Sequence, residues 1–165
     1  RLEAVDCDAD GCDAAIQRGD YRPGGAHADV LMPEELVVLA VLALLGGRRV
    51  LPDEELSRMP LLQQSTRPTL WLDWFRDAGL DSRTILRGAR FQHFDMVVHA
   101  AVAGLGVALV PEVVARTALA AGDLVLASER RLTGDQPYTL IYPHRSQQRE
   151  GFMRFCDWLL RQVDR

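Results

Sequence analysis

Short apolar runs alternate along the chain with segments whose apolar residues recur at helical spacing. The runs predict strands or extended pieces at residues 2–5, 13–17, 30–41 (interrupted by Pro33), 61–63, 83–91, 107–110, 124–126 and 138–142. The amphipathic segments predict helices at residues 42–45, 53–59, 70–78, 95–103, 111–121 and 148–162. This alternation is typical of an α/β protein with a largely parallel sheet.

Residues at the ends of these segments support the predicted helix limits. Asp53 and Thr69 are suitable N-cap residues, whereas Gly79 and Gly122 stand where helices are expected to stop. Pro111 is expected to be the first residue of its helix, since proline is tolerated there. The last helix is expected to place one set of apolar residues on a single face, namely Phe152, Phe155, Trp158, Leu159 and Val163.

Composition narrows the class of protein. The chain has 165 residues, of which 48% are hydrophobic, and its 19 basic and 23 acidic residues give a formal net charge of −4. A core can therefore form, while a free-standing nucleic-acid binder is disfavoured because phosphate contacts need clustered basic residues. No apolar run approaches the roughly 20 residues of a membrane span, and no signal peptide is visible. We expect a soluble, cytoplasmic protein without membrane contact.

Motifs for catalysis or metal binding are missing from the sequence. It contains no nucleophile elbow, no phosphate-binding loop and no zinc-protease motif, and the adjacent acids Glu34 and Glu35 are interpreted as solvated helix starts. Cys7, Cys12 and Cys156 match no zinc spacing with the four histidines. We expect no enzyme activity, no metal and no cofactor. The cysteines are expected to be free thiols, and a redox pair of Cys7 and Cys12 is the alternative.

Two polar loops precede predicted helices and could form an anion site. Ser65 and Thr66 come before the helix at Leu70, and the segment 92–95 comes before the next helix. Free backbone N–H groups at a helix N-terminus attract anions, and a nearby hydroxyl adds a donor. Such ligands bind at the carboxyl ends of strands in open α/β sheets, where these loops are expected. The alternative is that Ser65, Thr66 and Asp95 only cap their helices.

Several motifs occur in an order that resembles one protein family over nearly the whole chain. They are the segments 13–20 (DAAIQRGD), 60–62 (PLL), 71–75 (WLDWF), 94–95 (FD), 100–111 (AAVAGLGVALVP) and 138–143 (YTLIYP), followed by Phe152 and Trp158-Leu159. In this order they resemble the effector-binding domain of LysR-type transcriptional regulators. The Trp-x-x-Trp segment and the Ala-Ala-x-x-Gly-x-Gly-Val-Ala run are most similar to the branch that contains the glycine-cleavage and β-lactamase regulators.

The resemblance implies a fold of two Rossmann-like α/β lobes joined by crossing strands, as in type 2 periplasmic binding proteins. Lobe I would comprise residues 1–39 and 143–165, lobe II residues 44–136, and the hinge strands residues 39–42 and 138–142. Lobe I would lack its N-terminal strand and helix, and the N-terminal helix-turn-helix is absent from this chain. Val41 and Leu42 stand where the family has Ser-Pro, which removes a helix cap.

The resemblance also implies a function and a site. The chain would be the ligand-sensing regulatory domain of a DNA-binding transcription factor, with a small anionic, carboxylate-bearing effector in the cleft between the lobes. The full-length protein would form a dimer or tetramer and contact DNA only through its N-terminal domain. A solute-binding protein of the same fold is the alternative. The implied effector-binding residues are Ser65, Thr66, His93, Phe94, Gly19, Asp20 and Tyr142. Trp71 and Trp74 are expected to pack inside lobe II rather than line the cleft.

Overall fold

The chain divides into two units in the computed structural model, which describes residues 5–80 and 88–163. Unit 1 comprises Arg1–Glu34 and Gly134–Arg165, and unit 2 comprises Glu35–Thr133. The chain therefore passes between them after Glu34 and again after Thr133. The hinge segments expected at 39–42 and 138–142 lie a few residues further along, at the end of strand β3 (Glu35–Ala40) and on strand β9 (Tyr138–Tyr142).

Unit 2 is built on a mixed sheet with the strand order β5-β4-β6-β3-β7, and β8 also pairs with β3. Besides β3, its strands are β4 (Leu61–Gln64), β5 (Arg90–Phe91), β6 (Val107–Pro111), β7 (Val125–Leu126) and β8 (Leu132–Thr133). β4 is parallel to β5 and β6, but β3 is antiparallel to β6, β7 and β8. The largely parallel sheet was a wrong prediction, because an apolar run buried on both faces carries no information about strand direction.

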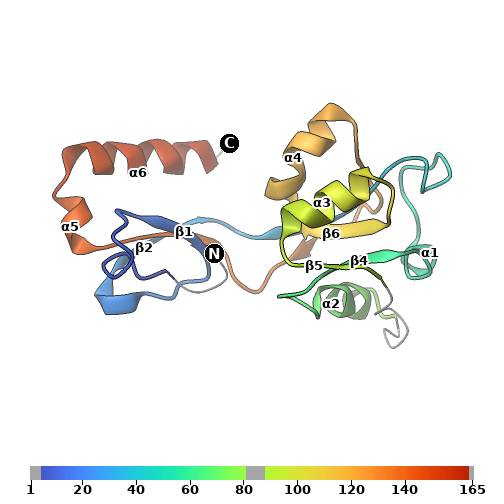
Figure 1. Cartoon of the computed structure of the whole chain (residues 1–165), viewed down its shortest axis with the longest axis horizontal. Coiled ribbons are helices and arrows are strands. Elements are labelled where there is room, and N and C mark those ends of the chain that lie inside the picture. The colour runs from blue at the N-terminus through green and yellow to red at the C-terminus, as the bar shows by residue number, and fades with distance from the viewer. Residues whose placement is uncertain (1–4, 81–87, 164–165) are drawn as a thin grey trace. The chain divides into compact units, whose positions relative to one another are not determined.

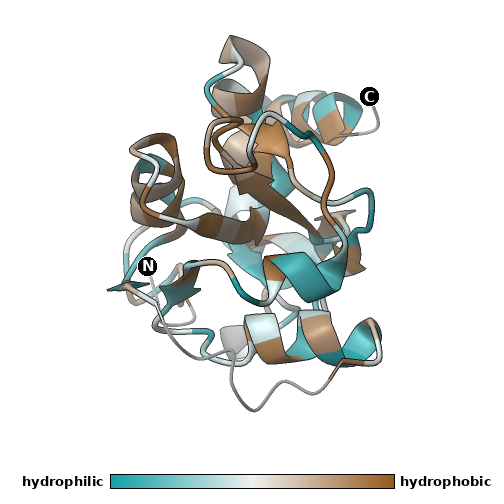
Figure 2. Ribbon diagram, turned by 90° about the vertical axis from the view of Figure 1, so that its right-hand side faces the viewer, coloured by the Kyte–Doolittle hydropathy of each residue, from teal (hydrophilic) through white to brown (hydrophobic). Residues whose placement is uncertain are grey.

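Helices cover both faces of this sheet (Figure 1). α2 (Leu70–Asp77) packs on one face, and α3 (Phe94–Val102) and α4 (Glu112–Ala121) pack on the other. Successive residues of β4 point to opposite faces, so that Leu61 contacts the α2 cluster and Leu62 the α3–α4 cluster. The central strands are largely apolar along their length, whereas some of the helices carry both apolar and polar residues (Figure 2). Trp71 and Trp74 are fully buried, which confirms that they pack inside this unit.

Most predicted helix limits are confirmed, but four local predictions were wrong. Pro111 is not the first residue of α4 but ends β6 and occupies the N-cap position of that helix. Residues 42–47 form consecutive turns rather than a helix, and Gly46 adopts a positive φ of 63°. Thr69 makes no side-chain cap hydrogen bond to α2. Asp53 lies inside α1 (Asp53–Leu56) instead of capping it, and its carboxylate accepts a hydrogen bond from Trp74 Nε1 at 2.8 Å. For Asp53, a tertiary partner thus replaces the local cap expected from the sequence.

Unit 1 contains a three-stranded antiparallel sheet with the order β1-β9-β2. Its elements are β1 (Ala15–Arg18), a short 3₁₀ turn (Pro23–Gly25), β2 (His27–Met32), β9, and the helices α5 (His144–Gln147) and α6 (Glu150–Val163). Two extended pieces on either side of Pro33 were expected, and β2 and β3 confirm them. The expected strand at 2–5 and most of the extended piece at 83–91 lie outside the described residues.

Helix α6 buries only part of its predicted apolar face. The core of unit 1 comprises Leu31, Leu140, Tyr142 and Cys156, and Phe152, Leu159, Leu160 and Val163 pack against it. Phe155 and Trp158 remain 43% and 51% exposed. Phe155 lies beside Phe152 and Trp158, with ring centroids 6.4 and 6.0 Å apart, so the aromatic residues do share one side of the helix. Phe155 and Trp158 stay exposed because the buried stripe follows Phe152, Cys156, Leu159 and Val163.

Candidate functional site

Strands β4 and β5 bring the two predicted loops of unit 2 together. The strands are parallel, with Gln64 beside Phe91, so both chains leave the same edge of the sheet. Directly after this edge, the backbone N–H and the hydroxyl of Ser65 both donate hydrogen bonds to the Phe91 carbonyl oxygen, each at 2.8 Å. The 65–67 loop is therefore fixed against the segment that leads into α3.

A buried glutamine ties these two loops together a second time. Gln64 Nε2 donates to the Gln92 carbonyl oxygen at 2.8 Å, and Gln64 Oε1 accepts a hydrogen bond from the Thr66 hydroxyl at 2.8 Å. These bonds place Thr66 beside the residues that precede α3. The sequence analysis missed Gln64, although a glutamine at the end of an apolar strand could have been noticed as a polar residue in a buried position.

The hydroxyls of this site do not act as helix caps. Ser65 donates to a loop carbonyl and Thr66 donates to a side-chain amide, so neither serves the amides of α2 or α3. His93 is the N-cap residue of α3, with φ −125° and ψ 150°, and makes no side-chain cap hydrogen bond. The N–H groups of the first turn of α3 thus lack a cap from His93, which is the condition for an anion site.

Charges near the start of α3 act in opposite directions on an incoming anion. The Arg67 guanidinium lies 5.8 Å from the centroid of the Phe94 ring and brings positive charge to the loop pair. Asp95, in the first turn of α3, is exposed and contributes a negative charge there. Arg67 was missed by the sequence analysis because one arginine among many in a polar loop has no distinguishing pattern.

The residues predicted in unit 1 lie at different ends of its sheet. Gly19 is buried at the end of β1 with a φ of 90°, and its N–H donates to the Pro137 carbonyl oxygen at 2.8 Å. The neighbouring Asp20 is exposed. Tyr142 is at the opposite end of β9, since Arg18 pairs with Tyr138. Unit 1 thus keeps Gly19 and Asp20 together and separates Tyr142 from them.

Tyr142 is part of the interior of unit 1. Its hydroxyl donates to Asp29 Oδ2 at 2.9 Å, and its ring stacks on His27 with centroids 5.4 Å apart. Burial, followed by the bond to Asp29, raises the pKa of Tyr142 to about 12. The hydroxyl is therefore a protonated donor at neutral pH that already has an acceptor.

A buried carboxylate marks the point where the chain leaves unit 1. Glu34 is 0% exposed and accepts hydrogen bonds from Arg18 Nε at 3.1 Å and from the Tyr138 hydroxyl at 3.3 Å. Its carbonyl oxygen accepts the Gly134 N–H at 2.8 Å. The prediction of a solvated helix start was wrong for Glu34, because it lies between two strands and its charge is paired inside the unit.

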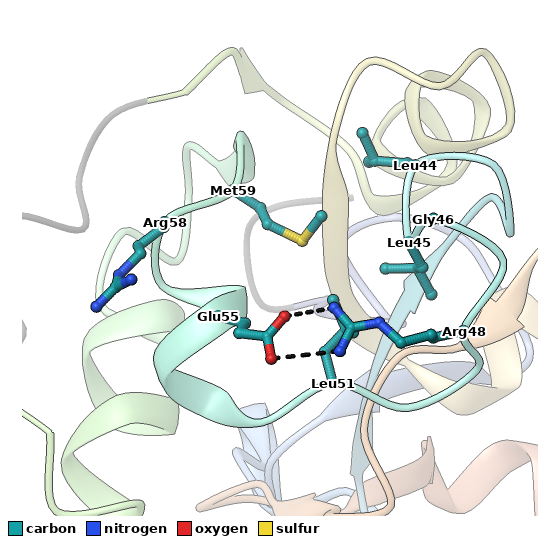
Figure 3. A pocket seen from close by; sticks show the side chains of 8 residues that line it. All are labelled: Leu44, Leu45, Gly46, Arg48, Leu51, Glu55, Arg58 and Met59. Carbon is teal, nitrogen blue, oxygen red and sulfur yellow. Dashed lines mark hydrogen bonds and ion pairs between the residues drawn. The ribbon is translucent and has the colours of Figure 1, made fainter.

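The surface of unit 2 also carries a hollow of about 450 Å³ beside α1 (Figure 3). It is lined by Leu44, Leu45, Gly46, Arg48, Leu51, Glu55, Arg58 and Met59. An ion pair between Arg48 and Glu55 crosses it, and this pairing lowers the pKa of the Glu55 carboxyl. None of the residues predicted from the sequence lines this hollow, so it is separate from the loop pair.

Metal ligands and membrane spans are also absent from the described parts of the chain. Over residues 5–80 and 88–163, no group of three or more His, Cys, Asp or Glu side chains is arranged to hold a metal ion. Within the same ranges, no helix has the length and apolar character needed to cross a bilayer.

Comparison with known proteins identifies the family of the chain. A family model described as the LysR substrate binding domain matches residues 3–164. The chain belongs to this family. The resemblance inferred from the motifs is thereby confirmed, as is the expected α/β fold of two lobes.

Relatives of this LysR substrate-binding domain are transcriptional regulators. The chain is 37% identical to the HTH-type transcriptional regulator TrpI of Pseudomonas aeruginosa, over 86% of this chain and 48% of that protein. It is 32% identical to the glycine cleavage system transcriptional activator of Escherichia coli K12, over 97% of this chain and 54% of that protein. The chain thus spans about half the length of the curated relatives it matches. Both relatives are named as transcriptional regulators, and neither is named as an enzyme.

Solved structures confirm the fold of the LysR domain. The effector domain of the transcriptional regulator AmpR of Pseudomonas aeruginosa superposes with a TM-score of 0.82 at 26% sequence identity. The match covers 99% of this chain and 78% of that chain. The domain therefore has the architecture of LysR effector domains.

Proposed function

We propose that this domain senses a small carboxylate-bearing effector for a LysR-type transcription factor, and that unit 2 binds the carboxylate at its loop pair. The observation that carries the proposal is that Ser65 and Thr66 are held beside the N-terminus of α3, which has no cap from His93. A helix N-terminus of this kind favours a negative charge within its first turn. Amino acids, aromatic acids and cell-wall peptides all carry the required group.

The existing hydrogen bonds determine what the loop must do when a carboxylate arrives. The Thr66 hydroxyl now donates to Gln64 Oε1 and has to rotate to donate to a ligand oxygen. The N–H groups at the start of α3 need no such change, and His93 adds a ring N–H at the same position. Arg67 supplies a positive charge that offsets Asp95. We assign the principal contact to the helix N-terminus and supporting contacts to Thr66, His93 and the backbone near Phe94.

The remaining parts of the proposal concern the whole protein. The domain has a net charge of −4, so DNA contact is assigned to a helix-turn-helix segment outside this chain. We propose a homodimer or tetramer in the cytoplasm as the working form of the regulator. The expectation that Gly19, Asp20 and Tyr142 contact the effector stays a prediction.

Thermal unfolding of the domain in the presence of carboxylates tests the proposal. A ligand that binds only the folded state stabilises it by about 2.7 kcal/mol at 100 times its dissociation constant, so the melting temperature should rise. The screen should include amino acids, aromatic acids and muramyl peptides, each with its amide as the control that lacks the carboxylate charge. The account predicts that an acid raises the melting temperature and its amide does not.

Substitutions then locate the site. Thr66→Ala and His93→Ala are expected to reduce the thermal shift, because each removes a donor from the loop pair. Thr133→Ala and His99→Ala are matched controls, since Thr133 bonds Glu35 on β3 and His99 is in the last turn of α3. An unchanged shift in both loop variants would move the site away from these loops.

A further inference from the structure

Two of the three cysteines lie side by side in one short loop of unit 1. The Cys12 N–H donates to the Cys7 carbonyl oxygen at 3.0 Å, and the Cys12 side chain is close enough to raise the pKa of the Cys7 thiol. Gly11 has a φ of 68°, which lets the chain turn between them. The backbone hydrogen bond and the turn at Gly11 thus bring the two cysteines together within one loop.

One arginine holds this loop from the outside. Arg145 Nη2 donates to the carbonyl oxygens of both cysteines, at 3.1 Å to Cys7 and 2.9 Å to Cys12. The same guanidinium bonds Asp8 at 2.9 Å and Asp13 at 3.1 Å. A single side chain from α5 thus fixes both cysteine backbones and the acids beside them, so the pair is positioned by tertiary structure as well as by its short spacing.

The two cysteines differ in access to solvent. Cys7 is buried and its thiol points to the Ile141 carbonyl oxygen on β9 at 3.9 Å, whereas Cys12 is half exposed. Cys156 is buried in α6, among the residues that pack on Leu140 and Tyr142. An oxidant from solution therefore meets Cys12 first, and the thiol next to it is that of Cys7.

We propose that Cys7 and Cys12 are a site of reversible thiol oxidation that forms an intramolecular disulfide with a disulfide oxidant such as glutathione disulfide. The Cys12 thiolate attacks one sulfur of glutathione disulfide, which gives a mixed disulfide and releases one glutathione thiolate. The Cys7 thiolate then attacks the Cys12 sulfur and releases the second glutathione thiolate. The two protein thiols lose two electrons and two protons, and both glutathione sulfurs are reduced to thiols.

The surroundings of Cys7 determine the rate of the second step, in which the Cys7 thiolate attacks the mixed disulfide at Cys12. Burial is the main cause that raises the pKa of the Cys7 thiol, to about 12, and the neighbouring Cys12 side chain raises it further. Because only the thiolate attacks, ring closure is slow at neutral pH and accelerates as the pH rises. Closure cross-links the loop that packs against β9, which makes the edge of unit 1 responsive to oxidation.

Equilibration in glutathione redox buffers followed by mass spectrometry tests the proposal. Trypsin releases Cys7 and Cys12 together in residues 2–18 and Cys156 separately in residues 155–161. After alkylation of the free thiols, the account predicts that residues 2–18 lose two hydrogen masses and stay unalkylated, while Cys156 remains reduced. The ratio of disulfide to dithiol protein at equilibrium, together with the glutathione concentrations, gives the effective concentration of the two thiols. The same measurement in guanidinium chloride gives the value for the unfolded chain.

Matched variants test whether the folded structure favours the Cys7–Cys12 disulfide, or whether the disulfide forms only because the two residues are close in sequence. Arg145→Gln is expected to lower the effective concentration by about fivefold or more, the size of one lost net hydrogen bond. Arg149→Gln is the control, because Arg149 bonds only the Asp13 carboxylate of this loop, at 2.8 Å. Cys156→Ser should leave the disulfide unchanged, and Cys12→Ser should abolish it. An effective concentration no higher in the folded than in the unfolded chain, or no disulfide at all, would overturn the proposal.

Discussion

Arg130 links α1 to α2 in unit 2, and nothing in the sequence around it predicts this role. Its guanidinium donates to Asp53 Oδ2 and to the Trp74 carbonyl oxygen, each at 3.0 Å, and lies 4.1 Å from the centroid of the Trp74 ring. We expect Arg130→Ala to lower the free energy of unfolding by about 2–3 kcal/mol, because it leaves a partly buried carboxylate and carbonyl without this donor. Urea unfolding followed by tryptophan fluorescence measures this change.

Arg76 provides the control for Arg130. It is an exposed arginine on α2, and among the described residues it forms an ion pair with Asp73, whose side chain is 43% exposed. Arg76→Ala is expected to change the free energy of unfolding by about 0.5 kcal/mol or less. Equal losses in the two variants would contradict the special role of Arg130.

The raised pKa of Tyr142 makes the free energy of unfolding depend on pH in the alkaline range. Its pKa is about 12 in the folded protein and its ordinary value is 10.0. The folded state therefore keeps the proton longer, so this contribution is complete below pH 10 and is lost as the pH rises towards 12. The expected loss is about 2–3 kcal/mol, in the free energy of unfolding measured with urea.

Tyr142→Phe isolates this effect. Cys7 titrates over a similar range, so the two proteins are compared at each pH and the difference between them is used. The difference should shrink from pH 9 to pH 11, because the phenylalanine variant has no proton to lose. A constant difference would show that the Tyr142 hydroxyl does not stay protonated in the folded protein.

Gly106, in the turn between α3 and β6, lets the backbone pass close to β4 because it has no side chain. A Cβ atom on Gly106 would lie 2.4 Å from the Pro60 carbonyl oxygen and 3.0 Å from the Leu62 side chain. Gly104 has a φ of 74°, but a Cβ there would meet only Val41 at 3.7 Å. We expect Gly106→Ala to cost about 2–3 kcal/mol through overpacking against β4, and Gly104→Ala about 1 kcal/mol through backbone strain. Chemical denaturation of both variants measures the two losses in the free energy of unfolding. A larger loss for Gly104→Ala than for Gly106→Ala would contradict the overpacking at Gly106.

Elements with strong local signals could be predicted from the sequence, and those defined by tertiary partners could not. α2, α3 and α4 were predicted because apolar spacing and glycines at 79, 104 and 122 define them locally. The antiparallel direction of β3 was not predicted, since its partner strands come from distant parts of the chain. In the candidate site, Ser65, Thr66 and His93 follow from loop position, whereas Gln64 and Arg67 emerge only when β4 pairs with β5.

At the scale of the molecule, the two units have cores of different size. The sheet of unit 2 is packed on both faces, and residues 37–40 of β3 are fully buried. The core of unit 1 is one small cluster beneath α6. Because opening free energy follows buried apolar contact, amides of β3 and β6 should exchange with solvent deuterium more slowly than those of β1 and β2. Hydrogen exchange with mass spectrometry measures this, and equal protection would indicate that both units open together.

Backbone amide NMR tests the central claim, which is carboxylate binding at the loop pair of unit 2. A carboxylate that raises the melting temperature is titrated into the labelled domain, with its amide as the control. We expect the largest shifts on the backbone amides of Thr66, Arg67, Phe94 and Asp95. The control ligand, in which an amide replaces the carboxylate, should leave these signals unchanged. Shifts confined to residues 44–59, around the hollow beside α1, would contradict it.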